Sequence, residues 1–187
     1  MSFPRLIPTG SQTVGPYFRI GLEYLIGQEP ANNSALDTIE IRGKVLDRDG
    51  APVSDAMLEF WGGDLSGSDS GVTPDSSGHP IGFHRAATDD NGNFTLVLNE
   101  PLPTALGDGR LQAPHMLVLV FARGLLRHLI TRVYFGGEPA NADDPVLLEI
   151  PAERRHTLVA RPDANNPRLF QWNVILQGEN ETVFFAW

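Results

Sequence analysis

Cysteine is absent from the 187 residues of this chain. Without thiols the chain can form no disulfide and can offer no thiolate ligand to a metal. Disulfide-stapled secreted folds and zinc-finger modules are therefore excluded. The composition is consistent with a reducing compartment, and we expect a cytoplasmic protein.

Long apolar segments and an excess of positive charge are missing as well. The longest apolar run, residues 116–122, is far shorter than the ~20 residues of a membrane-spanning helix. The first residues contain no basic stretch followed by an apolar core, so we expect no secretory signal. Fourteen Lys and Arg against 23 Asp and Glu give a net charge of −9. Such a balance favours solubility and argues against nucleic-acid binding, which needs a basic patch.

What the chain does contain is typical of a globular all-β protein. Hydrophobic residues make up 41% and charged residues 20%, and 19 Gly and 15 Pro indicate many turns. We expect one domain over residues 1–187, with residues 1–36 as an extended N-terminal arm because they show little periodicity. A short helical turn is expected at residues 21–27.

Strand signals follow the arm. Ile39, Ile41 and Val45 alternate with polar residues, the period-2 pattern of a half-buried strand. The segments 47–50 and 89–92 superficially suggest calcium loops, but neither has the glutamate spacing or the flanking helices of an EF-hand, so hairpin turns are favoured. With turn signals between about nine short strands and no long helix, the sequence predicts an antiparallel β-sandwich. The principal expected strands are 39–46, 56–61, 94–98, 115–122, 128–135, 146–150, 156–161, 169–176 and 182–186.

Three stretches together resemble the intradiol ring-cleavage dioxygenases. They are the strand-turn-strand GKVLDRDGAPVSDAMLEFW (43–61), the segment from Pro114-His115 through FARG (121–124) to TRVYF (131–135), and the terminal pair SQTVGPY (11–17) and GENETVFF (178–185). Within that family the resemblance is to the iron-free α chains of enzymes built from α and β subunits, and it covers nearly the whole length. It implies a β-sandwich of the intradiol dioxygenase type.

The resemblance also implies where a metal should be, and there this chain departs from the family. Members hold ferric iron with two tyrosines and two histidines, because hard phenolate oxygens favour Fe(III). His115 begins the expected His-x-His, but Leu117 holds its second position and cannot ligate iron. No tyrosine occurs at the expected positions in residues 71–80 or around residues 100–104; the three tyrosines of the chain are Tyr17, Tyr24 and Tyr134. We therefore predict no metal site here, a structural role for His115, and Fe(III) bound by a partner β subunit.

The activity implied is intradiol cleavage of protocatechuate (3,4-dihydroxybenzoate) by O2 to 3-carboxy-cis,cis-muconate, in the β-ketoadipate pathway of aromatic catabolism. The partner would be the iron-bearing β subunit in a higher-order α–β oligomer, and the apolar C-terminal residues 183–187 suggest a large interface. This chain would supply no catalytic residue. It would line the substrate pocket with Thr13, Gly15, Pro16 and Tyr17, and Arg123 would balance the substrate carboxylate.

Each of these roles has a structural alternative. Gly15 and Pro16 could simply shape the arm, and Arg123 could be a salt-bridged surface arginine at a strand end. The whole chain could instead be a non-enzymatic β-sandwich that binds or transports a ligand, since fold alone does not give function. Residues 11–17 and 121–124 favour the enzyme subunit, because a generic sandwich has no reason to carry them.

Overall fold

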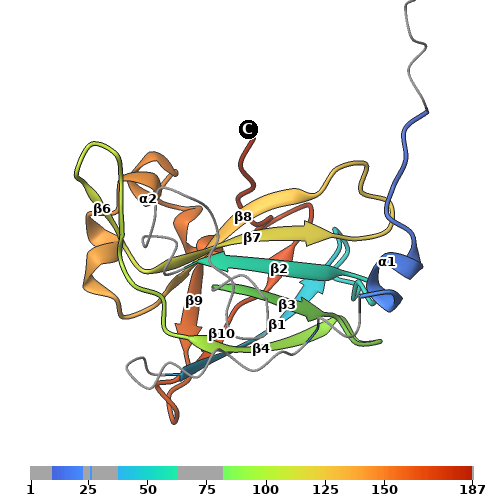
Figure 1. Cartoon of the computed structure of the whole chain (residues 1–187), viewed down its shortest axis with the longest axis horizontal. Helices are drawn as coiled ribbons and strands as arrows, with labels where there is room; N and C mark the ends of the chain where they lie inside the picture. Colours follow the sequence, from blue (N-terminus) through green and yellow to red (C-terminus); the bar gives the residue numbers. More distant parts are fainter. Residues whose placement is uncertain (1–9, 23–25, 27–37, 63–81, 187) are drawn as a thin grey trace, which may run out of the picture.

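The computed structural model describes residues 10–22, 26, 38–62 and 82–186. Strands dominate these ranges, with a few short helices beside them (Figure 1). In chain order the elements are α1 (Pro16–Ile20), β1 (Thr38–Leu46), β2 (Met57–Gly62), β3 (Phe83–Ala87), β4 (Asn93–Asn99), β5 (Thr104–Ala105), β6 (Leu111–Gln112), β7 (His115–Phe121), β8 (Leu129–Phe135), the 3-10 helix η3 (Pro139–Ala142), α2 (Pro145–Glu149), the 3-10 helix η4 (Arg155–Leu158), β9 (Val159–Pro162), β10 (Leu169–Gln171) and β11 (Val174–Ile175).

The described strands form one large sheet and a small β5–β6 hairpin. The order in the large sheet is β11-β1-β10-β9-β8-β7-β2-β3, and β4 pairs with β1. Because β3 also lies against β4, the sheet folds back on itself around a common core. The all-β sandwich is therefore confirmed. Its pairings are mixed, since β1 runs parallel to β10 and β11, and β8 runs parallel to β9.

The core follows from the alternation in the sequence. In β7 every second residue is buried, so Met116, Val118 and Val120 point inward while His115 and Leu117 occupy the opposite face. Gly43 of β1 allows a close approach of two backbones: a Cβ there would lie 1.6 Å from the carbonyl oxygen of Trp172. A side chain at this position would disrupt the packing of β1 against the segment after β10.

The turns at residues 47–50 and 89–92 are held by their first aspartates. The Asp47 carboxylate accepts hydrogen bonds from the backbone N–H groups of Asp49 and Ala51, and Asp89 does the same for Asn91 and Asn93. The glycine that ends each turn has a positive φ, 77° and 70°. The prediction of turns is confirmed.

Four sequence predictions need correction. The expected strand 146–150 lies mostly in helix α2 (Pro145–Glu149), because the Asp144 carboxylate caps the N–H groups of Val146 and Leu147. The expected strand 156–161 begins as η4 and becomes β9 only at Val159. The expected strand 169–176 is divided into β10 and β11. Residues 182–186 join no ladder, although Phe185 donates a backbone hydrogen bond to Ile130.

The arm also differs from its predicted extended form. Residues 10–15 have no regular structure, but Pro16–Ile20 form α1, for which Gly15 is the N-cap residue. Most of the predicted helical turn 21–27 lies outside the described residues. None of the described helices has the length and apolar character needed to cross a membrane.

Candidate functional site

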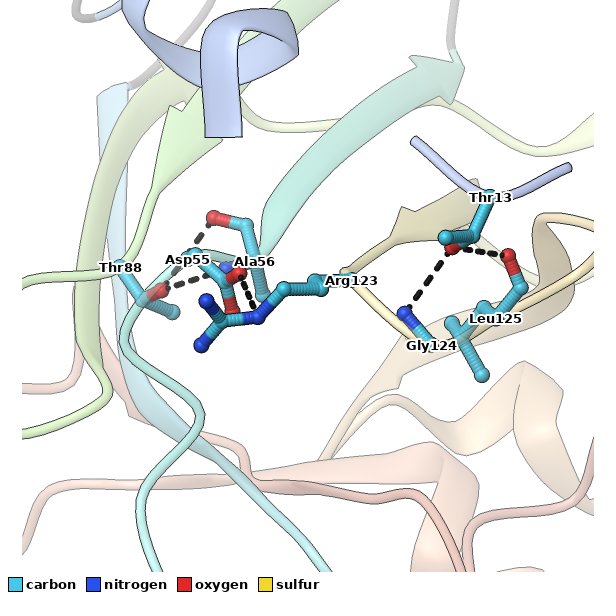
Figure 2. A network of polar contacts seen from close by, with 7 residues as sticks. All are labelled: Thr13, Asp55, Ala56, Thr88, Arg123, Gly124 and Leu125. Atoms are coloured by element: carbon cyan, nitrogen blue, oxygen red, sulfur yellow. Dashed lines mark hydrogen bonds and ion pairs between the residues drawn. The ribbon is translucent and has the colours of Figure 1, made fainter. Parts of the chain in front are cut away.

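The N-terminal arm meets the turn that follows β7. This turn spans residues 122–125, and Gly124 adopts a φ of 92°. The Thr13 hydroxyl accepts a hydrogen bond from the Gly124 N–H at 2.9 Å and donates one to the Leu125 carbonyl at 2.7 Å (Figure 2). The Phe18 ring on α1 packs 5.1 Å from that of Phe121. The arm is therefore fastened to the end of β7.

A surface pocket of about 340 Å³ lies between the arm and this turn. Its walls come from the arm, the end of β7 and the residues before β8; they are Gln12, Thr13, Val14, Phe121, Ala122, Leu125, Leu126, Arg127 and His128. Of the residues predicted to bind substrate, only Thr13 lines it. Tyr17, on α1, is 80% exposed.

Arg123 belongs to the same turn but points toward β2. Its Nε lies 3.2 Å from Oδ2 of Asp55, and its side chain is 68% exposed. In Figure 2 the guanidinium lies on the Asp55 side of the turn, while Thr13 contacts the following residues. The structure thus brings Thr13 and Arg123 to one turn, and it gives Arg123 the ion pair that the structural alternative expects. The substrate role of these residues stays a prediction.

His115, the one residue of the expected metal site that this chain retains, lies on the outer face of β7. His115 is half-buried, its Nδ1 lies 2.8 Å from the Ala113 carbonyl oxygen, and its ring stacks on Tyr134 at 5.2 Å. Burial raises the pKa of Tyr134 well above its ordinary value, so the hydroxyl stays protonated, unlike a phenolate ligand. Within the described ranges, no group of three or more His, Asp or Glu side chains could hold a metal ion. One imidazole beside Leu117 does not fit the iron of the family.

The His115 environment gives a pH prediction. Burial lowers the pKa of this imidazole below its ordinary value near 6.5, so the folded chain resists a proton that the unfolded chain accepts. The free energy of unfolding should therefore fall as the pH drops below about 6.5, where the unfolded state binds more protons. His115→Gln should reduce this slope in denaturation curves recorded from pH 7.5 to 5.5. Because burial also lowers the pKa of His84, part of the slope should remain; an unchanged slope would contradict the prediction.

Sequence reasoning missed a buried network behind His115. Asp144 is fully buried and accepts hydrogen bonds from the Tyr134 hydroxyl at 3.1 Å and the Ala113 N–H at 2.8 Å. The Arg132 guanidinium donates to the Tyr134 hydroxyl and to the side chain of Gln112. The Asp-Pro pair before an apolar run is a helix-start signal that could have revealed the capping part of this network. Asp55 was missed although it lies in the stretch 43–61, because its partner is set by the pairing of β2 with β7.

Comparison with known proteins decides the family. The dioxygenase family model matches residues 26–178. The protocatechuate 3,4-dioxygenase alpha chain of Burkholderia cepacia is 41% identical over 192 residues, covering 95% of this chain and 96% of the relative. The alpha chain from Pseudomonas putida is 36% identical, covering 96% and 97%. This chain belongs to the intradiol dioxygenase family.

Other members of the intradiol family match less closely. The protocatechuate 3,4-dioxygenase beta chain of B. cepacia is 24% identical, over 78% of this chain and 67% of the relative. Among solved structures, the 3-chlorocatechol 1,2-dioxygenase of Rhodococcus opacus 1CP has a TM-score of 0.63 at 21% identity, covering 94% of this chain and 69% of that one. This last likeness shows the fold alone. The family membership favours the enzyme subunit over the non-enzymatic binding module.

Proposed function

We propose that this chain is the iron-free α subunit of a protocatechuate 3,4-dioxygenase and helps to form its substrate pocket. The observation that carries the proposal is the near full-length similarity to two alpha chains, at 41% and 36% identity. The docked arm adds to it, because Thr13 fastens residues 10–15 beside the Arg123 turn. An arm fixed in this way can present a stable wall to a neighbouring subunit.

The proposed division of labour follows from the side chains that each subunit has. The β subunit would bind Fe(III), which would supply the chemistry for the cleavage of protocatechuate by O2 to 3-carboxy-cis,cis-muconate. This chain would contribute positioning and charge balance, through Thr13, Gly15, Pro16 and Tyr17 on the arm and Arg123 on the turn. The assembly would be a cytoplasmic α–β oligomer that takes protocatechuate and O2.

The purified chain alone should bind no ferric iron and remain colourless. The reason is the donor set, in which Leu117 replaces the second histidine and no tyrosine stands at the expected ligand positions. Metal analysis and visible spectroscopy after incubation with ferric iron would check this. A burgundy isolated chain with a tyrosinate-to-iron charge-transfer band would contradict it.

Co-expression with an iron-bearing β chain should give a stable heteromer with protocatechuate-dependent O2 uptake. The apolar C-terminal residues support a subunit interface less strongly than the sequence suggested, because Val183, Phe184 and Phe185 pack against this chain's own core. The exposed large apolar side chains of the described residues are Tyr17 and Ile20 on the arm, Leu126 beside the turn, and Leu102, Leu111 and Leu148 elsewhere. Size-exclusion chromatography with activity assays tests the assembly. A chain that stays monomeric beside an active β chain would overturn the proposal.

A further inference from the structure

Asp55 and Arg123 meet because of the register between two strands. Met57 of β2 pairs with Phe121 of β7 in an antiparallel ladder. Continuing that register by two residues on each strand places Asp55 opposite Arg123. The separation of 3.2 Å between Asp55 Oδ2 and Arg123 Nε agrees with this placement. The pairing of β2 with β7 therefore brings the two residues close together, so the contact is more than a chance meeting of two surface side chains.

The two partners differ in how firmly they are held. Asp55 is only 19% exposed, against 68% for Arg123. The residue after Asp55 is bound to the residue that follows β3, because Ala56 N–H donates to the Thr88 hydroxyl and Thr88 N–H donates to the Ala56 carbonyl, both at 3.0 Å. Thr88 itself is fully buried. Figure 2 shows this anchor on one side of Arg123. The backbone beside Asp55 is thus fixed, and its carboxylate lies against a long, exposed side chain.

The backbone of the Arg123 turn is held separately. The Thr13 hydroxyl bridges the Gly124 N–H and the Leu125 carbonyl, so the arm fixes the turn just after Arg123. Asp55 restrains the guanidinium while Thr13 restrains the backbone. An exposed ion pair contributes little to stability. Because the backbone is fixed beside both partners, the contact is better explained by the orientation that it gives to the guanidinium.

We infer that Asp55 is a positioning residue, which holds Arg123 by its Nε so that the two terminal nitrogens are presented to the carboxylate of an aromatic substrate. This inference rests on the proposed function. A guanidinium binds a carboxylate best with two parallel N–H donors, and a contact at Nε leaves the edge formed by the two terminal nitrogens open. Fixing the rotamers of Arg123 before the substrate arrives removes an entropy cost from binding.

The test uses the assembled α–β enzyme and steady-state kinetics with protocatechuate and with catechol, which lacks the carboxylate. Asp55→Ala should raise the KM for protocatechuate about three- to tenfold, with little change in kcat, because binding and not chemistry loses a preorganised contact. The kinetics with catechol should not change. Asp55→Asn should restore part of the loss, since the amide keeps a polar oxygen of the same size beside Nε while losing the charge.

A double-mutant cycle separates positioning from packing. Asp55→Ala should have no further effect in an Arg123→Ala background. The matched control is Asp108→Ala, which removes the aspartate from another exposed pair, Asp108–Arg110, and should leave both substrates unaffected. Equal losses for the two substrates, an effect that persists without Arg123, or an unchanged or lowered KM in Asp55→Ala would overturn the inference. If Arg123→Ala affects the two substrates equally, both the proposed role of Arg123 and this inference are wrong. If Arg123→Ala impairs protocatechuate more than catechol but Asp55→Ala does not, only this inference is wrong.

Discussion

Replacing Asp144 by Ala should cost about 3–5 kcal/mol in the free energy of unfolding, because it leaves several buried donors without an acceptor. The carboxylate accepts from Ala113 N–H, Val146 N–H and Leu147 N–H at 2.8, 2.9 and 2.8 Å, and from the Tyr134 hydroxyl at 3.1 Å. These bonds join β8, α2 and the segment before β7. For a domain of this size the loss corresponds to a fall in Tm on the order of 10 °C.

Denaturant and thermal unfolding of the variant measure this loss, and the chain offers a close control. Asp143 precedes Asp144 in the sequence and is exposed, so Asp143→Ala should change stability by less than about 0.5 kcal/mol. Asp144→Asn should fall between the two, because the amide keeps one acceptor oxygen but loses the charge. Equal stabilities for the Asp143 and Asp144 alanine variants would show that the network adds nothing.

Several of the strands that the sequence predicted well have one buried face. Residues 39–46, 94–98 and 115–122 agree with β1, β4 and β7 to within about one residue at each end. Their alternation fixes both the strand and the face it buries. The run Val146-Leu147-Leu148 carries no such information, since a short apolar run fits a strand or a helix equally well. There the Asp144 cap, which lies outside the run, determines that the segment is a helix.

The same distinction separates the site residues that could be predicted from those that could not. Thr13 and Arg123 stand in short motifs that resemble the family, so the sequence can name them. Asp55 depends on the register of β2 with β7, which pairs residues far apart in the chain. The two hydrogen bonds of the Thr13 hydroxyl likewise form only because the arm lies against a turn far away in the sequence. Motifs therefore identify the residues, and the sheet determines which of them meet.

Arg123→Ala should lower kcat/KM for protocatechuate about tenfold to a hundredfold in the assembled enzyme, a loss on the order of 1.5–3 kcal/mol of charge-assisted contact. Catechol, which has no carboxylate to balance, should lose far less. A contact that runs through a water molecule would put the loss near the low end of this range. Iron content and assembly should stay intact, because Arg123 is not proposed as a metal ligand.

Kinetics with both substrates, iron analysis and size-exclusion chromatography of one preparation check these expectations together. Arg110→Ala is a matched control, since Arg110 is also exposed and paired with an aspartate, Asp108, at 2.8 Å. Equal losses for the two substrates would assign Arg123 to packing or assembly, and no loss would leave it a surface arginine paired with Asp55. The ion pair with Asp55 already exists without substrate, so a structural role alone could explain Arg123. Only a loss in kcat/KM that depends on the substrate carboxylate can show that the guanidinium contacts the substrate.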